Sequence, residues 1–157
     1  MGKYNKKKQI LKLFQIHSFD DVTAVIFVTS LSEYNQKMVE DSKQIRMMES
    51  ILLFDETVNS RFFRNTPIII FFNKDDIFRE KIQKIDLTCC FPEYKGGKNY
   101  DKAINYIHEQ FVNVDKNKSR QIFTHITCAT DTKAIKVVIE AVKNIILRQV
   151  LFENDLL

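Results

Sequence analysis

Ile68-Ile69-Ile70-Phe71-Phe72-Asn73-Lys74-Asp75-Asp76 is the stretch that decides the fold of this chain. It joins five apolar residues directly to a polar Asn-Lys-x-Asp tetrad. A short uncharged run rich in Ile and Phe, bounded by Pro67, is typical of a strand that is covered on both faces. Ligands of an open α/β sheet bind beyond the carboxyl ends of its strands. The tetrad therefore falls where such a fold would hold a ligand.

The tetrad has the hydrogen-bonding groups to recognise guanine. The carboxylate of Asp76 can accept hydrogen bonds from both the N1–H and the N2 amine of guanine. Adenine offers no such pair and would leave the carboxylate unpaired. Asn73 can donate to the purine N7, and Lys74 can lay its aliphatic stem along the flat face of the base. The alternative is a surface turn that spells Asn-Lys-x-Asp by chance.

A second candidate motif follows the next strand-like run, Ile122 to Ile126. Its residues are small and lie between that run and a long helical pattern, so the backbone N–H of Ala129 could meet guanine O6. An ordinary strand-to-helix turn, with Thr130 or Asp131 as the helix N-cap, is the alternative, and both interpretations can hold together. The predicted base site comprises Asn73, Lys74, Asp75, Asp76, Thr127, Cys128, Ala129 and Thr130.

Further motifs occur around these two in a fixed order. They are Arg46-Met47-Met48-Glu49-Ser50, Leu53-Phe54-Asp55, Phe91-Pro92-Glu93-Tyr94 and, extending the second candidate motif, Asp131-Thr132-Lys133. Together with the two base motifs they resemble the carboxyl half of a heterotrimeric G-protein alpha subunit, from about Ile16 to Leu157. The resemblance implies a partial Ras-like (P-loop NTPase) α/β domain over residues 20–157. This domain would be a three-layer α/β/α arrangement with a mostly parallel sheet, without the amino-terminal strands and the helical insert. A basic, irregular segment, 1–19, would precede it.

The glycine content limits the expected chemistry. A P-loop needs the pattern G-x-x-x-x-G-K-[ST] to hold phosphates, and Gly2, Gly96 and Gly97 are the only glycines. The resemblance places phosphate and Mg²⁺ binding on a P-loop and two switch segments, none of which this sequence contains. We therefore expect weak recognition of the base of GTP or GDP, no Mg²⁺ site and no catalytic residue for GTP hydrolysis.

Composition favours a cytoplasmic protein of one domain. The longest apolar-leaning run without a charge, Val22 to Ser32, is shorter than the roughly 20 residues of a membrane helix. Cys89, Cys90 and Cys128 lack the spacing of metal ligands, which fits a reducing compartment. The net charge of +4 is spread over helix surfaces without interleaved exposed aromatics, which argues against nucleic-acid binding. Lys3 and Lys6 to Lys8 could contact the inner face of the plasma membrane. A solvated, frayed terminus is the alternative.

The end of the chain is the expected site for a partner. The resemblance implies that the final helix, Thr132 to Phe152, and the residues after it insert into a G-protein-coupled receptor. The predicted receptor contacts are Asn154, Asp155, Leu156 and Leu157. A frayed terminus is the alternative. The family also binds a beta–gamma pair, but much of that surface lies in segments that this sequence lacks. A non-enzymatic receptor-binding decoy and a truncated, inactive product remain alternative functions.

Hydrophobic periodicity predicts the other elements. We expect a buried strand over Val22–Thr29 whose edge lacks the neighbour found in the family. A helix should begin at Ser32 or Glu33 and run to about Phe54, with Met38, Ile45, Met48, Ile51 and Leu52 as its apolar stripe. Helices are also expected over Asp76–Lys84 and Asn99–Phe111.

Overall fold

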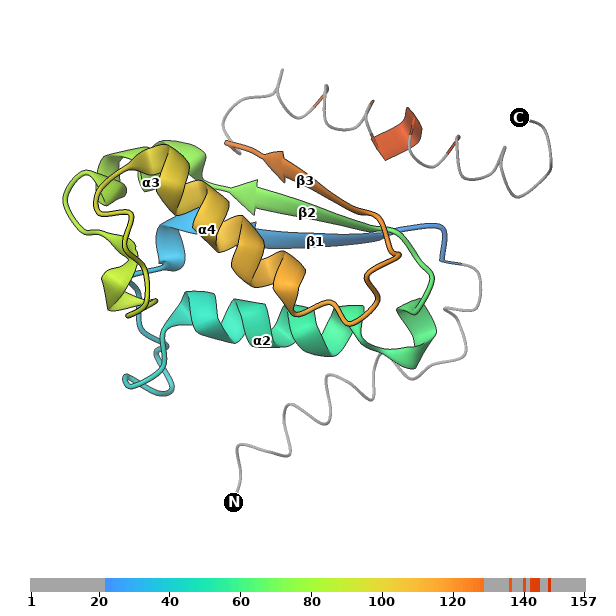
Figure 1. Ribbon diagram of the computed structural model, residues 1–157, viewed down its shortest axis with the longest axis horizontal. Helices are drawn as coiled ribbons and strands as arrows, with labels where there is room; N and C mark the ends of the chain where they lie inside the picture. The colour runs from blue at the N-terminus through green and yellow to red at the C-terminus, as the bar shows by residue number, and fades with distance from the viewer. Residues whose placement is uncertain (1–21, 129–135, 137–139, 141, 145–146, 148–157) are drawn as a thin grey trace.

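The computed structural model describes residues 22–128, 136, 140, 142–144 and 147. Its sheet has three parallel strands in the order β1 (Val25–Ser30), β2 (Ile68–Asn73) and β3 (Ile122–Ile126), as Figure 1 shows. Val25 pairs with Ile68, and Ile68 pairs with Ile122. Parallel neighbours need a crossover between them, and each connection here contains at least one helix. All three carboxyl ends therefore lie at the same end of the sheet.

The crossovers contain three α-helices and three short 3₁₀ turns in the described part of the chain. The first connection holds η2 (Leu31–Glu33), α2 (Arg46–Val58) and η3 (Arg61–Phe63). The second connection holds α3 (Asp75–Ile82), η4 (Leu87–Cys89) and α4 (Tyr100–Asn113). Helices α2 and α4 lie against one face of the sheet (Figure 1).

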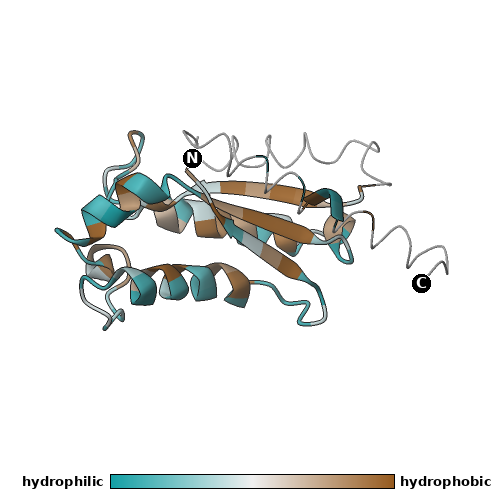
Figure 2. Ribbon diagram, turned by 90° about the horizontal axis from the view of Figure 1, so that it is seen from above, coloured by the Kyte–Doolittle hydropathy of each residue, from teal (hydrophilic) through white to brown (hydrophobic). Residues whose placement is uncertain are grey.

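Aromatic side chains fill the space between the sheet and these two helices. Phe27 of β1 makes an edge contact with Phe54 of α2, with ring centroids 4.9 Å apart. Phe72 of β2 meets Phe111 of α4 at 5.4 Å, and Phe54 meets Phe111 at 5.5 Å. Apolar colouring follows the strands and one side of each helix in Figure 2. Edge-to-face packing of this kind adds to the hydrophobic burial, so these rings fix how both helices sit on the sheet.

Strand β1 is half-buried, which corrects the prediction of a buried strand over Val22–Thr29. Phe27 faces the core, whereas Ile26 and Val28 on the opposite face are 53% and 61% exposed. Ile69 and Ile70 of β2 are fully buried, as the sequence predicted. The difference arises because β1 pairs with β2 alone among the described residues, while β2 lies between two strands.

The helix expected from Ser32 or Glu33 was placed too early. The chain leaves β1 through the short turn η2, forms an isolated antiparallel bridge between Lys37 and Ile45, and becomes α-helical only at Arg46. The side chain of Asp41 accepts a hydrogen bond from the backbone N–H of Lys43 at 3.2 Å. Asp and Ser compete with a helix in this way by bonding their own backbone.

The apolar stripe of α2 is also displaced from the predicted one. The buried residues are Met47, Ile51, Phe54 and Val58, whereas Met48 and Leu52 are 42% and 39% exposed. Phe54 sets the rotation of the helix because it packs between Phe27 and Phe111. The sequence pattern of α2 was compatible with either apolar stripe. The contacts of Phe54 with Phe27 and Phe111 determine which stripe is buried.

The remaining expectations agree with the structure or fall outside it. Helices α3 and α4 and strands β2 and β3 begin and end within two residues of their predicted limits. Most of the final helix predicted over Thr132–Phe152, and all of segment 1–19, lie outside the described residues. Within the part that the structure describes, no helix is long and apolar enough to cross a membrane.

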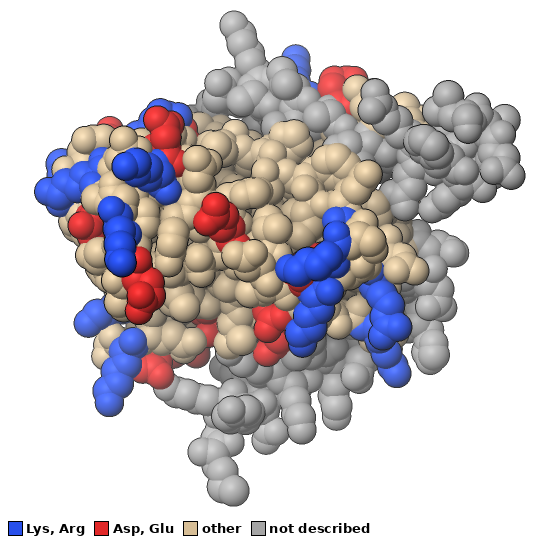
Figure 3. Space-filling model, viewed as in Figure 1, with Lys and Arg blue, Asp and Glu red and all other residues tan. Residues whose placement is uncertain are grey.

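Charged side chains concentrate at the two ends of the face seen in Figure 3. One group lies over the end that carries α3 and η4. The other, at lower right, lies over η3 and the loop between α4 and β3. Acidic side chains are mixed into both groups. The basic residues at this second end belong to two short segments, 61–64 and 116–120.

Candidate functional site

The two motifs singled out in the sequence lie in direct contact at the carboxyl ends of β2 and β3. The backbone N–H of Thr127 donates to the carbonyl of Phe72 at 2.8 Å, and that of Asp75 donates to the carbonyl of Thr127 at 3.2 Å. The hydroxyl of Thr127 lies 3.5 Å from Oδ1 of Asn73. These contacts hold the loop after β3 beside the loop after β2, as the parallel topology predicted.

Lys74 turns the chain sharply out of β2. Its backbone is left-handed, with φ 61° and ψ 42°, and its N–H donates to Oδ1 of Asn73 at 2.8 Å. This conformation costs a non-glycine residue about 1–2 kcal/mol. Such a cost is typical of functional loops. The turn places Asp75 and Asp76 in the first turn of α3, where the helix dipole favours negative charge.

The two aspartates of the tetrad have different environments. The carboxylate of Asp75 is paired with Nε of Arg79 at 2.7 Å and accepts a hydrogen bond from the hydroxyl of Tyr100 at 2.6 Å. The guanidinium of Arg79 also lies over the ring of Tyr100, 3.8 Å from its centroid. Asp76 is exposed and makes no hydrogen bond or ion pair within the described residues. Asp76 is therefore the carboxylate that can accept from a ligand, and Asp75 ties α3 to α4.

A polar hollow of about 300 Å³ lies next to the tetrad, between the ends of β1 and β2. Asn73 and Lys74 form part of its wall, and Ser30 and Glu33 face them. The hydroxyls of Thr29 and Ser50 bond each other at 2.8 Å in its lining. Glu33 lies 3.2 Å from Nε of Arg46 and 4.0 Å from Nζ of Lys74. The hollow extends the polar surface of the tetrad towards β1.

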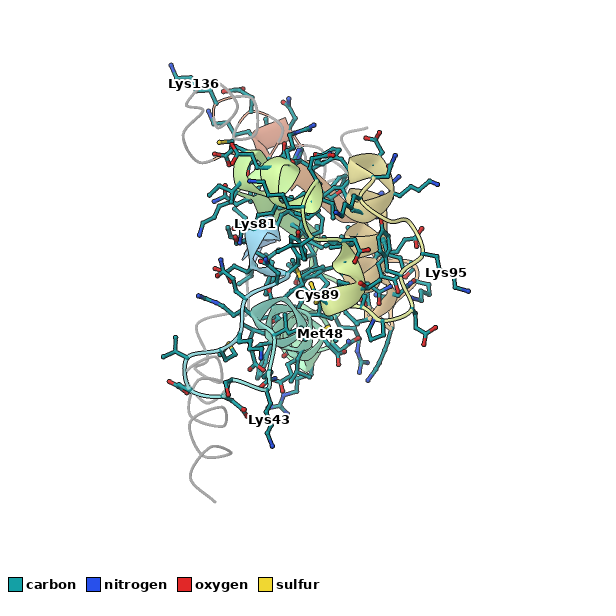
Figure 4. The ribbon with its side chains drawn as sticks, turned by 90° about the vertical axis from the view of Figure 1, so that its left-hand side faces the viewer. Lys43, Met48, Lys81, Cys89, Lys95 and Lys136 are labelled. Carbon is teal, nitrogen blue, oxygen red and sulfur yellow. The ribbon has the colours of Figure 1, made fainter. Side chains whose placement is uncertain are left out.

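Lys81 of α3 forms hydrogen bonds to the segment that follows β1. Its ammonium donates to the carbonyl of Ser32 at 2.9 Å and to Oδ1 of Asn35 at 3.0 Å. In Figure 4 its side chain lies beside the segment that follows β1. Because Lys81 belongs to α3, this contact connects the helix that carries Asp76 to the loop that carries Glu33.

The structure describes part of the predicted base site. Asn73 to Asp76, Thr127 and Cys128 are described, and Thr127 and Cys128 are buried and half-buried respectively. Ala129 and Thr130 lie outside the described residues, as do Asn154, Asp155, Leu156 and Leu157. No group of three or more His, Cys, Asp and Glu side chains that could hold a metal occurs in the described part of the chain.

Sequence reasoning missed the residues that support the tetrad. The Asp75–Arg79 pair has the i,i+4 spacing of helix ion pairs and could have been predicted from it. Tyr100 and Glu33 could not, because they are distant in the sequence and reach the tetrad only through the folded arrangement of α4 and η2.

Comparison with known proteins supplies the family. The family model described as G-protein alpha subunit matches residues 6–146. The chain belongs to the G-protein alpha subunit family. Its parallel sheet and the helices that cross over it are part of the Ras-like α/β domain of a G-protein alpha subunit.

Three similar relatives are named as alpha subunits of guanine nucleotide-binding proteins. The alpha-2 subunit of Dictyostelium discoideum is 53% identical over 138 residues, which cover 88% of this chain and 38% of the relative. The alpha-4 subunit of Caenorhabditis briggsae is 51% identical, with 85% and 38% covered. The alpha-8 subunit of Caenorhabditis elegans is 47% identical, with 85% and 36% covered. This chain thus spans less than two-fifths of the length of these G-protein alpha subunits.

Proposed function

We propose that this chain recognises the guanine base of GTP or GDP, as a component of signal transduction downstream of G-protein-coupled receptors. The observation that carries the proposal is the direct contact between the loops after β2 and β3, with the carboxylate of Asp76 free beside them. The three similar relatives are guanine nucleotide-binding proteins, which supports the choice of a guanine nucleotide.

Each residue of the proposed site has a distinct task. Asp76 accepts from the N1–H and the N2 amine of guanine, and Asn73 donates its amide to N7. The stem of Lys74 covers one face of the ring, and the N–H of Ala129 donates to O6. Adenine would leave Asp76 without a donor, and the discrimination between the two bases follows from that unpaired carboxylate.

The isolated chain of 157 residues is expected to bind the nucleotide weakly. Phosphate transfer needs residues that hold the phosphates, a bound Mg²⁺ and an oriented water, and this sequence has no P-loop pattern. Base contacts alone contribute about 3–5 kcal/mol, which corresponds to a dissociation constant on the order of millimolar. We therefore propose that this chain by itself neither binds Mg²⁺ nor hydrolyses GTP.

The receptor contact is proposed for the carboxyl end. Asn154, Asp155, Leu156 and Leu157 would enter an apolar groove of a G-protein-coupled receptor as the end of a helix. The domain is proposed to occupy residues 20–157, after the basic segment 1–19, which would contact the inner face of the plasma membrane. A beta–gamma contact would use little of the surface that this chain contributes.

Calorimetry of the full chain with GDP and with ADP tests the proposal. We expect millimolar binding of GDP and no detectable binding of ADP. Asp76→Ala should abolish the GDP signal, and Glu80→Ala should leave it unchanged, because Glu80 is an exposed residue one turn further along α3. Equal affinity for GDP and ADP, or unchanged binding by Asp76→Ala, would overturn it. Phosphate release from GTP above that of a mock-purified sample would refute the proposed lack of hydrolysis.

A further inference from the structure

The end of the sheet opposite the base site carries a second pocket, of about 470 Å³. It lies between the carboxyl end of α2, the turn η3 and the loop that joins α4 to β3. Its lining has three basic residues and no acidic one. The lining includes Arg64, Lys116, Arg120, Ser60, Asn65 and Ser119.

Arg120 forms the rigid inner wall of this pocket. Its side chain is 2% exposed, and its Nη1 and Nη2 donate to the carbonyls of Val58 and Arg64, both at 2.8 Å. The guanidinium has five N–H donors, and these two bonds use only two of them. Its Nε lies 3.5 Å from Oδ2 of the buried Asp115 and makes no hydrogen bond in the described structure. Arg120 thus keeps unused donors next to the pocket.

The outer wall is held by the backbone of the same segments. Nδ2 of Asn117 donates to the carbonyl of Arg64 at 2.9 Å, and the N–H of Lys116 donates to Oδ1 of Asn59 at 3.0 Å. These bonds use the backbone of Arg64 and Lys116 and leave their charged ends unrestrained. Both side chains are exposed at the rim.

The rim has an excess of positive charge. Asp115 offsets the charge of Arg120, but neither Arg64 nor Lys116 forms an ion pair within the described residues. Arg61 and Lys118 are exposed neighbours in the same two segments. Figure 3 shows this basic group over the end of the molecule where η3 and the α4–β3 loop lie. An anion would find uncompensated cations here and a desolvated arginine behind them.

We propose that this pocket binds the phosphate group of a hydroxyl-bearing small molecule. Arg64 and Lys116 contact the phosphate oxygens, and Ser60, Asn65 and Ser119 bond the hydroxyls of the attached body. The volume of about 470 Å³ lies in the range of small-molecule sites and leaves room beyond a bare phosphate. A soluble phosphate ester and the headgroup of a phosphoinositide lipid share this chemistry.

The pocket is independent of the base site. Arg64 precedes β2, and Arg120 precedes β3. In contrast, Asn73 is the last residue of β2, and Thr127 follows β3. A strand of six residues spans about 20 Å. A guanine nucleotide at the carboxyl end of the sheet therefore does not compete with an anion at the amino end. A negative result for one proposed site does not affect the proposal for the other.

Calorimetry of the full chain with inorganic phosphate and with inositol trisphosphate tests the soluble ligand. The double variant Arg64→Gln/Lys116→Gln should weaken inositol trisphosphate binding by about tenfold or more, since bonds to charged groups are lost. Lys43→Gln/Lys95→Gln removes the same charge from two exposed lysines labelled in Figure 4, away from the pocket, and should bind as the native chain does. Circular dichroism checks that both double variants fold. If Arg64→Gln/Lys116→Gln does not fold, Lys116→Gln alone replaces it in the test.

Sedimentation with phosphatidylcholine vesicles, with or without phosphatidylinositol bisphosphate, distinguishes the two sources. Binding only to vesicles that contain the phosphoinositide, lost in Arg64→Gln/Lys116→Gln, assigns the lipid headgroup. Binding of inositol trisphosphate without vesicle binding assigns a soluble phosphate ester. The proposal is wrong if neither ligand binds, or if the two double variants lose affinity equally, because that result indicates net charge and not the pocket. Undiminished binding of inositol trisphosphate by Arg64→Gln/Lys116→Gln also counts against it.

Discussion

Two ion pairs of this molecule show how burial changes the role of a charged residue. The Asp75–Arg79 pair lies at the surface, with 56% of the arginine side chain exposed. The Asp115–Arg120 pair is 3% and 2% exposed, and Arg120 also bonds two backbone carbonyls. Exposed pairs contribute little to stability, whereas removing one partner of a buried pair leaves an uncompensated charge.

Replacing Arg120 with methionine is therefore expected to lower the free energy of unfolding by about 3–5 kcal/mol. Asp115 would stay buried without a partner, and the carbonyls of Val58 and Arg64 would lose their donor. Arg79→Met serves as the matched change at the exposed pair and should cost at most about 1 kcal/mol. Urea unfolding of both variants measures the difference. Equal losses would show that the buried pair has no special role.

The buried Tyr34 and the half-buried Tyr100 make stability depend on high pH. Burial raises the pKa of Tyr34, and the nearby Cys89 and Asp86 raise it further. Burial and then the hydrogen bond to Asp75 raise the pKa of Tyr100. The unfolded chain releases these protons near pH 10 while the folded chain retains them. The stabilising effect is thus complete below that pH and is lost as the pH rises towards the folded values.

We expect the free energy of unfolding to fall as the pH rises above about 10. Tyr100→Phe should show a shallower fall, because one of the titrating groups has been removed. Urea unfolding across this range measures the slope, and the ultraviolet absorbance of tyrosinate reports the titration itself. A slope that is the same in the native chain and in Tyr100→Phe would contradict the assignment.

At the scale of elements, the sequence correctly predicted the helices and strands whose hydrophobic pattern fitted only one kind of element. The apolar run of β2 and the periodic stripe of α4 correspond to single elements, and both begin within one residue of the predicted start. The start of α2 was wrong because Asp41 stabilises a turn that the apolar stripe did not reveal. Contacts such as Tyr100 to Asp75 join elements that are distant in the sequence, so no local pattern contains them.

The N-terminus of α4 offers a test of an element boundary that both sequence and structure place at Asn99. The side chain of Asn99 accepts a hydrogen bond from the backbone N–H of Lys102 at 2.9 Å. Asn99→Ala is expected to destabilise the protein by about 1 kcal/mol, and Asn99→Asp should retain the cap. Thermal unfolding measures how much stability Asn99→Ala and Asn99→Asp each lose. Equal losses in both would indicate that the cap contributes nothing.

At the scale of the whole molecule, the described sheet has an open apolar side at β1. Ile26 and Val28 are 53% and 61% exposed, and β1 pairs only with β2 in the part of the chain described here. Exposed apolar strands at a sheet edge favour pairing with another chain. The open β1 expected from the sequence therefore remains a reason to predict self-association.

The isolated chain is expected to self-associate as its concentration rises. Ile26→Thr/Val28→Thr should reduce the association because it removes apolar surface and keeps residues that favour strands. Met48→Gln, at a residue of α2 that is 42% exposed, should leave the association unchanged. Sedimentation equilibrium measures the association constant. A native chain that remains a monomer at all concentrations and melts cooperatively would contradict this prediction.

The central feature proposed for this chain is one guanine ring held between the loops after β2 and β3. Backbone amide shifts of the isotope-labelled chain, recorded during titration with guanosine and with adenosine, test this most directly. We predict that guanosine shifts the amides of Asp76 and Ala129 together, with one dissociation constant, and that adenosine shifts neither. Shifts confined to one loop, or equal shifts with both nucleosides, would contradict the account.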